Sequence, residues 1–166
     1  MRILLAIHSI DLNTPEFYDY MEKQLRQDPK TFLLFLGMRN VDRQLLGPLR
    51  KRFRESKDNF FYISSRKKDG AMGNFADFAT YKASFSRVLK KLQEKCGSRE
   101  RVEVISFGGA ATVCYKDISL PAHKAIWKAF EGRKIRSTTF LPLVYGRKKL
   151  KKSTLRTLFG KIRRRK

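Results

Sequence analysis

Short apolar runs without a helical period alternate with amphipathic segments along most of the chain, and this alternation constrains the fold more than any other feature. The runs lie at 2–10, 31–36, 59–64 and 101–107. The first is nearly continuously apolar, which is typical of a central strand covered on both faces, and the others are mostly aliphatic or aromatic, which also predicts strands. A further β-prone segment follows at 135–144. Strands that alternate with helices predict a three-layer α/β fold, in which a mostly parallel sheet of about five strands carries helices on both faces.

The segments between the runs carry signals for where helices begin and end. Thr14-Pro15-Glu16 supplies an N-cap and a first-turn proline, which predicts a helix over about 15–28. Apolar residues keep a helical period over 75–96, and Gly97 is the expected stop. A proline opens a shorter helix over 121–132.

Two places allow more than one interpretation. The helical pattern at 45–53 contains Pro48, which requires either a helix beginning near Gly47 or a kink, because proline cannot donate the interior hydrogen bond. Later in the chain, Gly108-Gly109 separates a predicted strand from the strand-prone residues 110–115. This pattern is typical of a two-residue β-hairpin, which we favour over a turn at the glycines into a helix.

The net charge of +23 is the strongest compositional signal. Residues 147–166 contain 11 Lys or Arg and no acid, whereas the other 27 basic residues and all 15 acidic residues lie before them, which gives the body a net charge of +12. We therefore predict an α/β domain over 1–146 and a basic tail over 147–166. A chain with this much self-repulsion is expected to bind a polyanion.

Several classes of protein are excluded. Cys96 and Cys114 are too few for a disulfide framework and lack the spacing of zinc ligands, so we expect a cytoplasmic, reducing environment. The opening residues 1–7 are too short for a secretory leader, and no run approaches the ~18 apolar residues of a membrane span. The glycines at 70–73 lack the Gly-Lys-Ser/Thr that closes a Walker loop.

Basic residues in three regions are the predicted nucleic-acid contacts, because few acids balance them. The tail also has an apolar stripe, Leu155, Leu158, Phe159 and Ile162, which would suit a helix that enters an RNA groove or, as the alternative, lies on an anionic membrane. The predicted contacts lie in a loop (Arg66, Lys67, Lys68), on two helices (Arg50, Arg54, Lys90) and in the tail (Arg147, Lys148, Lys149, Arg156, Arg163, Arg164).

Four short motifs lie at or near the ends of the predicted strands and at the start of a predicted helix. In chain order, they are Asp11-Leu12-Asn13 after the first strand, Phe35-Leu36-Gly37, Gly73-Asn74-Phe75-Ala76-Asp77-Phe78 and Val104-Ile105-Ser106. These motifs resemble those of the PIN-like nucleases, including the NYN group. The resemblance covers roughly residues 2–107, and its most specific part is the helix-start motif around Asp77.

This resemblance implies a metal-dependent nuclease or a degenerate relative of one. The family places carboxylates at the carboxyl edge of a parallel sheet, where they hold Mg²⁺ or Mn²⁺ for cleavage of a phosphodiester. Asp11 and Asp77 match those positions, as metal ligands and catalytic residues. Ser106 is followed by Phe107-Gly108-Gly109-Ala110, without the acid of the family motif, and Asp42 or Asp117 would replace it only in a different fold. A domain that binds nucleic acid without cutting it, and so needs no cofactor, is therefore equally implied.

The first functional hypothesis is a nucleic-acid-binding protein that contacts phosphates, prefers RNA to DNA and works within a ribonucleoprotein complex. The second is a Mg²⁺- or Mn²⁺-dependent endoribonuclease, and the third is a structural protein that docks on a membrane or an acidic partner. His8 and His123 have no catalytic partner in the sequence pattern, so we expect both to be structural.

Overall fold

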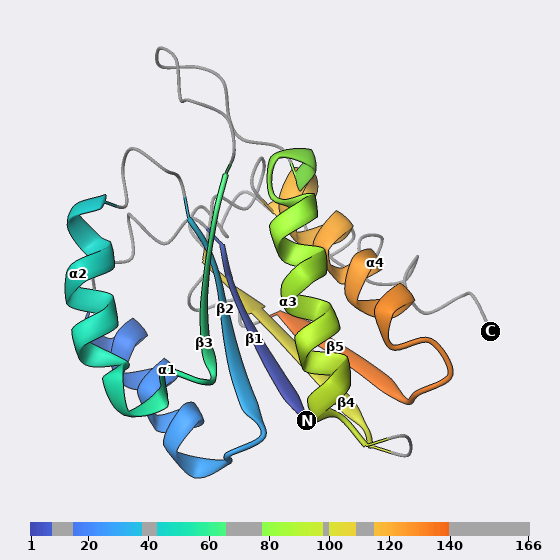
Figure 1. The fold of residues 1–166 in the computed structure, drawn as a ribbon, viewed down its shortest axis with the longest axis horizontal. Coiled ribbons are helices and arrows are strands. Elements are labelled where there is room, and N and C mark those ends of the chain that lie inside the picture. Colours follow the sequence, from blue (N-terminus) through green and yellow to red (C-terminus); the bar gives the residue numbers. More distant parts are fainter. Residues whose placement is uncertain (8–14, 38–42, 66–77, 98–99, 109–114, 140–166) are drawn as a thin grey trace.

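The computed structural model describes residues 1–7, 15–37, 43–65, 78–97, 100–108 and 115–139. They form a five-stranded sheet in which every neighbouring pair of strands is parallel (Figure 1). This sheet confirms the predicted fold class. The strands, in the spatial order β3-β2-β1-β4-β5, are β1 (Arg2–Ile7), β2 (Thr31–Gly37), β3 (Phe60–Ser64), β4 (Val102–Phe107) and β5 (Ile135–Thr139).

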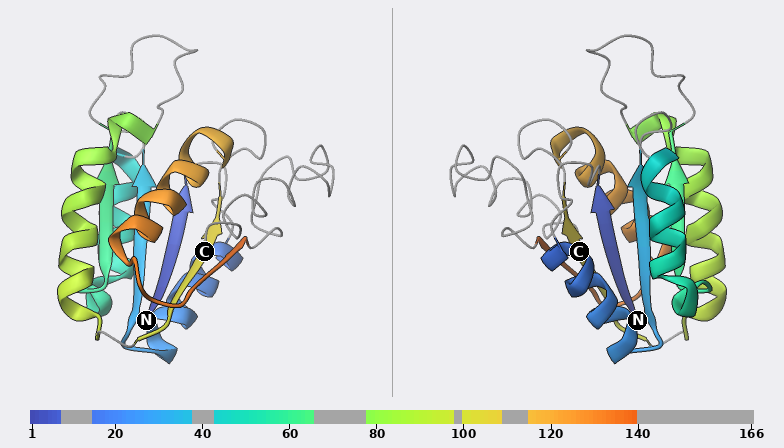
Figure 2. Two further views of the ribbon diagram at one scale, coloured as in Figure 1. Left: turned by 90° about the vertical axis from the view of Figure 1, so that its right-hand side faces the viewer. Right: turned by 90° about the vertical axis from the view of Figure 1, so that its left-hand side faces the viewer.

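Helices cover both faces of the sheet (Figure 2). On one face α1 (Pro15–Gln27) and α2 (Arg43–Arg52) pack against the sheet, and on the other face α3 (Lys82–Lys95) and α4 (Leu120–Ala129) do so. Three short turns accompany the helices: the 3₁₀ turns η2 (Arg54–Ser56) and η3 (Phe78–Thr80), and a π-helical turn, η4 (Tyr115–Ser119).

The core lies in two layers, one on each side of the central strands. In β1, Leu4 and Ala6 face the layer under α1 and α2, whereas Ile3, Leu5 and Ile7 face the layer under α3 and α4. Because the side chains of a strand alternate between the two faces, a strand that is covered on both sides must be apolar throughout. This explains the continuous apolar composition of β1 and β2, whose side chains are almost all buried.

The path of the chain reverses between β1 and β4. From β1 the chain runs through β2 to the outer strand β3, and it then returns past β1 to β4 and β5. Right-handed crossovers place the helices of the first half on one face and those of the second half on the other. In such sheets ligands bind at the carboxyl ends of the strands on either side of the reversal, which here are β1 and β4.

The predicted hairpin after Gly108 is wrong. β4 pairs with β1 on one side and with β5 on the other, both in parallel, so neither edge of β4 is free for an antiparallel partner. Tyr115, predicted in a strand, begins the helical turn η4 that leads into α4. The prediction that the strand ends at the glycines is nevertheless correct. Gly108 follows the last residue of β4 and has a φ of 80°, a conformation that favours glycine.

α2 runs from Arg43 to Arg52 with Pro48 inside it, so of the two interpretations of this segment the structure excludes a helix that begins near Gly47. The proline costs one main-chain hydrogen bond. Two element predictions need smaller corrections. α3 begins at Lys82 rather than near residue 75, which leaves Asp77 outside its first turn. β3 is an edge strand of the described sheet, and four of its five residues are only partly buried because β2 is its one neighbour among the described strands.

The later start of α3 has a packing reason. Residues 78–80 form a 3₁₀ turn, and the amide of Tyr81 donates to the carbonyl of Phe78 at 3.0 Å. Tyr81 is fully buried at this point, and the rings of Phe78 and Phe85 meet edge to face at 5.3 Å. The tighter turn thus places aromatic side chains in the core.

Candidate nucleic-acid interface

The carboxyl edge of the sheet is the predicted place for a metal. Asp11, Asp77 and Asp42 lie outside the described residues, and Asp117 is an exposed residue of η4. The segments that contain Asp11 and Asp77 follow β1 and β3, which end at the same edge but are separated by β2. Within the described ranges, no three His, Cys, Asp or Glu side chains are grouped closely enough to hold a metal ion.

Most of the predicted phosphate contacts also lie outside the described residues. This holds for the loop that follows β3 and for the whole of the basic tail. The contacts concerned are Arg66, Lys67, Lys68, Arg147, Lys148, Lys149, Arg156, Arg163 and Arg164. His8 and Cys114, which are not predicted contacts, also lie outside the described residues.

The predicted contacts on the helices are described, and all three side chains are exposed. Arg50 lies in α2 and Arg54 in η2, whereas Lys90 lies in α3. α2 and α3 pack on opposite faces of the sheet, so these residues do not form one compact cluster. Both helices nevertheless flank the edge strand β3, as Figures 1 and 2 show.

α3 is rich in positive charge that has no acidic partner in the described part of the molecule. Its exposed residues include five cations, and Glu94 is the acid in the same helix. No described acidic side chain forms an ion pair with any of these cations. The five cations are Lys82, Arg87, Lys90, Lys91 and Lys95.

Three of these cations form a row along one side of α3. Arg87, Lys91 and Lys95 are spaced by four residues, which places them on the same face of a helix. The amino group of Lys95 donates to the carbonyl of Asp58 at 3.2 Å, and it lies 5.3 Å from the centre of the Phe32 ring. Because Asp58 lies just before β3, the row runs along the side of α3 that faces this edge strand.

The opposite face of the sheet uses its charges differently. Arg52, at the end of α2, forms ion pairs with Asp19 and Glu22 of α1. Glu22 also pairs with Arg26 at 2.7 Å, and Arg26 lies 3.7 Å from Glu55. These contacts join α1 to α2 and to η2, so Arg26 and Arg52 have internal acidic partners.

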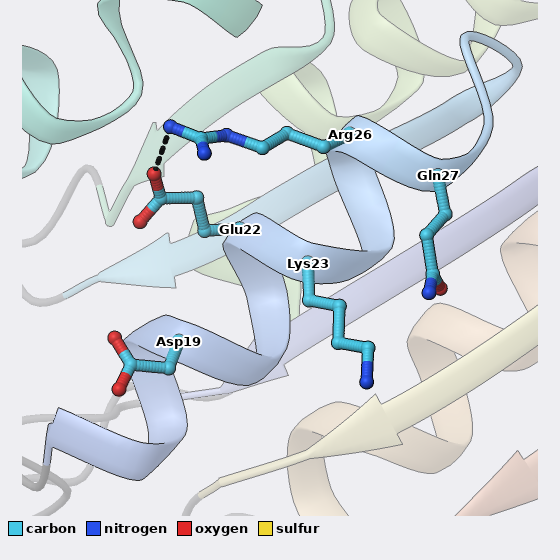
Figure 3. Close-up of a pocket in the computed structure, with 5 residues that line it drawn as sticks. All are labelled: Asp19, Glu22, Lys23, Arg26 and Gln27. Atoms are coloured by element: carbon cyan, nitrogen blue, oxygen red, sulfur yellow. Dashed lines mark ion pairs between the residues drawn. The ribbon is translucent and has the colours of Figure 1, made fainter.

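A shallow hollow of about 400 Å³ lies on the outer side of α1, beside these ion pairs. Figure 3 shows its lining, in which Glu22 and Arg26 pair with each other and Asp19 lies one turn before them. The wall carries both signs of charge and includes no apolar residue, which does not favour an anion or an apolar ligand. The lining residues are Asp19, Glu22, Lys23, Arg26 and Gln27.

A buried polar network joins α4 to β4 and β5. The two ring nitrogens of His123 lie 3.0 Å from the hydroxyl of Ser106 and 3.2 Å from that of Ser137, which also accepts from the Trp127 indole at 3.2 Å. A neutral imidazole with its proton on Nε2 fits these contacts, because the Ser137 hydroxyl then donates its own proton to Nδ1. Burial of the ring lowers the pKa of His123 from 6.5 to about 4.

This network is structural rather than catalytic. Ser106 is 0% exposed and His123 is 1% exposed, so no substrate reaches the hydroxyl. A ring with such a low pKa is also a weak base at neutral pH. The prediction that His123 is a structural residue is confirmed.

Sequence reasoning missed the pairing of Arg52 and the row on α3. The four-residue spacing of Arg87, Lys91 and Lys95 is visible in the sequence, but the side of α3 on which they lie depends on where the helix packs. The acids that neutralise Arg52 are about 30 residues away along the chain, and only the fold brings them close.

Comparisons with known proteins add no evidence for a function of this surface. No protein-family model matches the sequence, and no curated protein is significantly similar to it.

Proposed function

We propose that the protein binds nucleic acid, RNA in preference to DNA, mainly through the phosphates. The observation that carries the proposal is the set of exposed cations on α3, which have no acidic partner among the described residues. A charge that stabilises the fold is normally paired, as Arg52 is, whereas an unpaired set on one helix is available to an external anion.

The distribution of charge over the whole chain supports the same function. The body carries a net charge of +12 without the tail, and the tail adds +11. No described helix is long and apolar enough to cross a membrane. A polyanion that contacts both parts would relieve their repulsion.

The test is the dependence of RNA affinity on salt. With ~6–10 phosphate contacts, the affinity should fall by about 10³–10⁵ between 50 and 200 mM salt, because each contact releases condensed counterions. Fluorescence anisotropy with a labelled RNA measures this slope, and a DNA of the same sequence and length tests the preference for RNA. A flat response, or no binding at 50 mM salt, would contradict the proposal.

A Mg²⁺- or Mn²⁺-dependent endoribonuclease is the second candidate. It is favoured by the parallel sheet, because the segments that contain Asp11 and Asp77 both follow strands that end at the carboxyl edge. The resemblance to PIN-like nucleases adds the expectation that these carboxylates hold the metal. In this candidate the bound metal would supply an activated water and neutralise charge on the phosphate.

Substitution of the two aspartates separates cutting from binding. Asp11→Asn or Asp77→Asn should abolish Mn²⁺-dependent cleavage and leave RNA binding unchanged or tighter, because each change removes a negative charge near the phosphates. If the wild-type protein cleaves no RNA with any divalent metal, the protein binds without cutting.

A further inference from the structure

The cations of α2 and α3 flank the edge strand β3 from the two faces of the sheet. On α3, the row that contains Arg87 and Lys91 ends at Lys95, which touches the residue that leads into β3. β3 has β2 on one side only, so its other side is open among the described residues. The two views in Figure 2 and the view in Figure 1 agree that β3 lies between α2 and α3.

The geometry of α2 turns its free cations toward the same edge. Arg52 faces α1, where it pairs with Asp19 and Glu22. Arg50 precedes Arg52 by two residues, which is a rotation of about 200° around the helix, and it therefore faces away from α1. Arg54 follows in η2, and both Arg50 and Arg54 are exposed with no ion pair to a described acid.

Acidic groups near this surface are few. Glu94 lies on the exposed side of α3, and Asp58 precedes β3. Glu55 lies in η2, but it is turned toward Arg26 at 3.7 Å. Positive charge therefore dominates both sides of β3.

The described surface lacks the groups that bind single strands by stacking. Every described aromatic side chain is buried or partly buried, and none is exposed. Proteins that hold single strands usually stack bases on exposed aromatic rings, whereas duplexes are held by shape and by contacts to phosphates.

We infer that the surface around β3 binds a double-stranded nucleic acid, with the α2 cations on one phosphate backbone and the α3 cations on the other. This inference rests on the proposed function and names its substrate class. The cations of α2 and those of α3 lie on opposite faces of the sheet, so they match the two phosphate backbones of a duplex better than the single backbone of one strand. The contacts to phosphate carry no sequence information, so binding is independent of sequence. The surface comprises Arg50, Arg54, Arg87, Lys91 and Lys95, together with Lys57, an exposed residue directly after η2.

The experiment compares three paired variants of the full chain. Arg50→Gln with Arg54→Gln removes the α2 charges, and Arg87→Gln with Lys91→Gln removes the α3 charges. Lys124→Gln with Lys128→Gln is the matched control, because these two exposed lysines of α4 are also spaced by four residues but lie on a helix that does not flank β3. Thermal unfolding verifies that each variant is folded.

Each variant is titrated with a 20-base-pair RNA duplex and with one of its strands, at several salt concentrations. We expect the wild type to bind the duplex more tightly than the strand. Each β3-edge variant should lose about tenfold or more in duplex affinity, and the magnitude of its salt slope should fall by about 2, since roughly 0.9 is lost per contact. The α4 variant should change little.

Equal or tighter binding of the single strand, or an equal loss in the α4 variant, would overturn the inference and leave the proposed function intact. If the wild type bound neither RNA, the proposed function itself would fail.

Discussion

Arg52 and Arg87 are both helical arginines, but their surroundings differ. Arg52 is 35% exposed and lies between two carboxylates of α1, one of them at 3.1 Å. Arg87 is exposed on α3, where its guanidinium reaches only the carbonyl of Ala83, at 3.4 Å, among the described residues. One arginine is a link between two helices, and the other has no acid to neutralise it.

The difference shows that net charge alone does not identify a binding surface. The α1–α2 side has acids placed on its cations, so part of its positive charge stabilises the fold. On α3, none of the five cations forms an ion pair with a described acid. Removal of a paired charge should therefore affect stability, and removal of a free charge should affect binding.

The largest expected effect on stability concerns the polar network inside the molecule, where every partner is internal. His123 has a pKa of about 4 in the folded state and 6.5 as its ordinary value, so the unfolded state binds the proton first as the pH falls. The stability is fully present above pH 6.5 and falls between pH 6.5 and 4. The loss is about 3 kcal/mol, at about 1.36 kcal/mol per pKa unit.

Urea unfolding of the wild type and of His123→Gln across this pH range measures that loss. The variant has no imidazole to titrate at this position, so the difference between the two curves isolates His123. Parallel curves from pH 7 to 4 would contradict the buried neutral ring. Hydrogen bonds from the Met1 amino group and from Lys30 lower the pKa of Glu100 to about 2, so its contribution to stability begins to fall below about pH 4.5. Glu100 is present in both proteins, so its effect cancels in the difference between the two curves.

The second effect is the structural value of Arg52. Arg52→Gln should lower the free energy of unfolding by about 1 kcal/mol, because partly exposed ion pairs typically contribute that amount or less. Lys23→Gln on α1 is the control, since Lys23 is exposed and has no ion pair to a described acid. Equal stability of the two variants in denaturant titrations would contradict the claim that the ion pairs of Arg52 stabilise the fold.

A third, smaller effect would convert a free charge into a paired one. Ala83 lies one helical turn before Arg87 and is exposed, so Ala83→Glu places an acid at the favourable spacing and near the start of α3. Relative to Ala83→Gln, stability should rise by about 0.3–0.5 kcal/mol, and RNA affinity should fall. A rise in stability without any loss of affinity would show that Arg87 does not contact RNA.

The smallest effect on stability is expected from the tail. Removal of residues 147–166 should leave the free energy of unfolding almost unchanged, because the apolar stripe of the tail is too narrow to anchor a core. RNA binding should weaken, and the salt slope should fall by up to ~0.7 for each lost contact to a single strand. If truncation left RNA affinity unchanged but abolished binding to anionic vesicles, the tail would be a membrane-binding element.

The fold was largely predictable because strand and helix periods are local properties. Within β2, residues 32–36 include no polar side chain that would suit an exposed face. The hairpin after Gly108 was mispredicted for a non-local reason, since its propensity was sound but β1 and β5 occupy both edges of β4. The edge position of β3 could not be predicted from the sequence either, because the order of strands in a sheet depends on how all the segments pair.

The candidate site was predictable only in part. The excess of Lys and Arg on the third predicted helix is evident in the sequence, and so is its spacing. Which cations are neutralised depends on contacts between distant segments, such as Arg52 with Asp19. Composition therefore predicts a polyanion partner, whereas the fold separates structural charges from those available for binding.

The most direct test is the RNA affinity of Arg52→Gln and Arg87→Gln, measured by fluorescence anisotropy in the same buffer at 100 mM salt. Both variants lose one positive charge from a helix, so a general effect of net charge would weaken both equally. The account predicts that Arg87→Gln binds about five- to tenfold more weakly, the order expected for one lost phosphate contact, and that Arg52→Gln binds like the wild type. An equal loss in both variants, or a larger loss in Arg52→Gln, would contradict it.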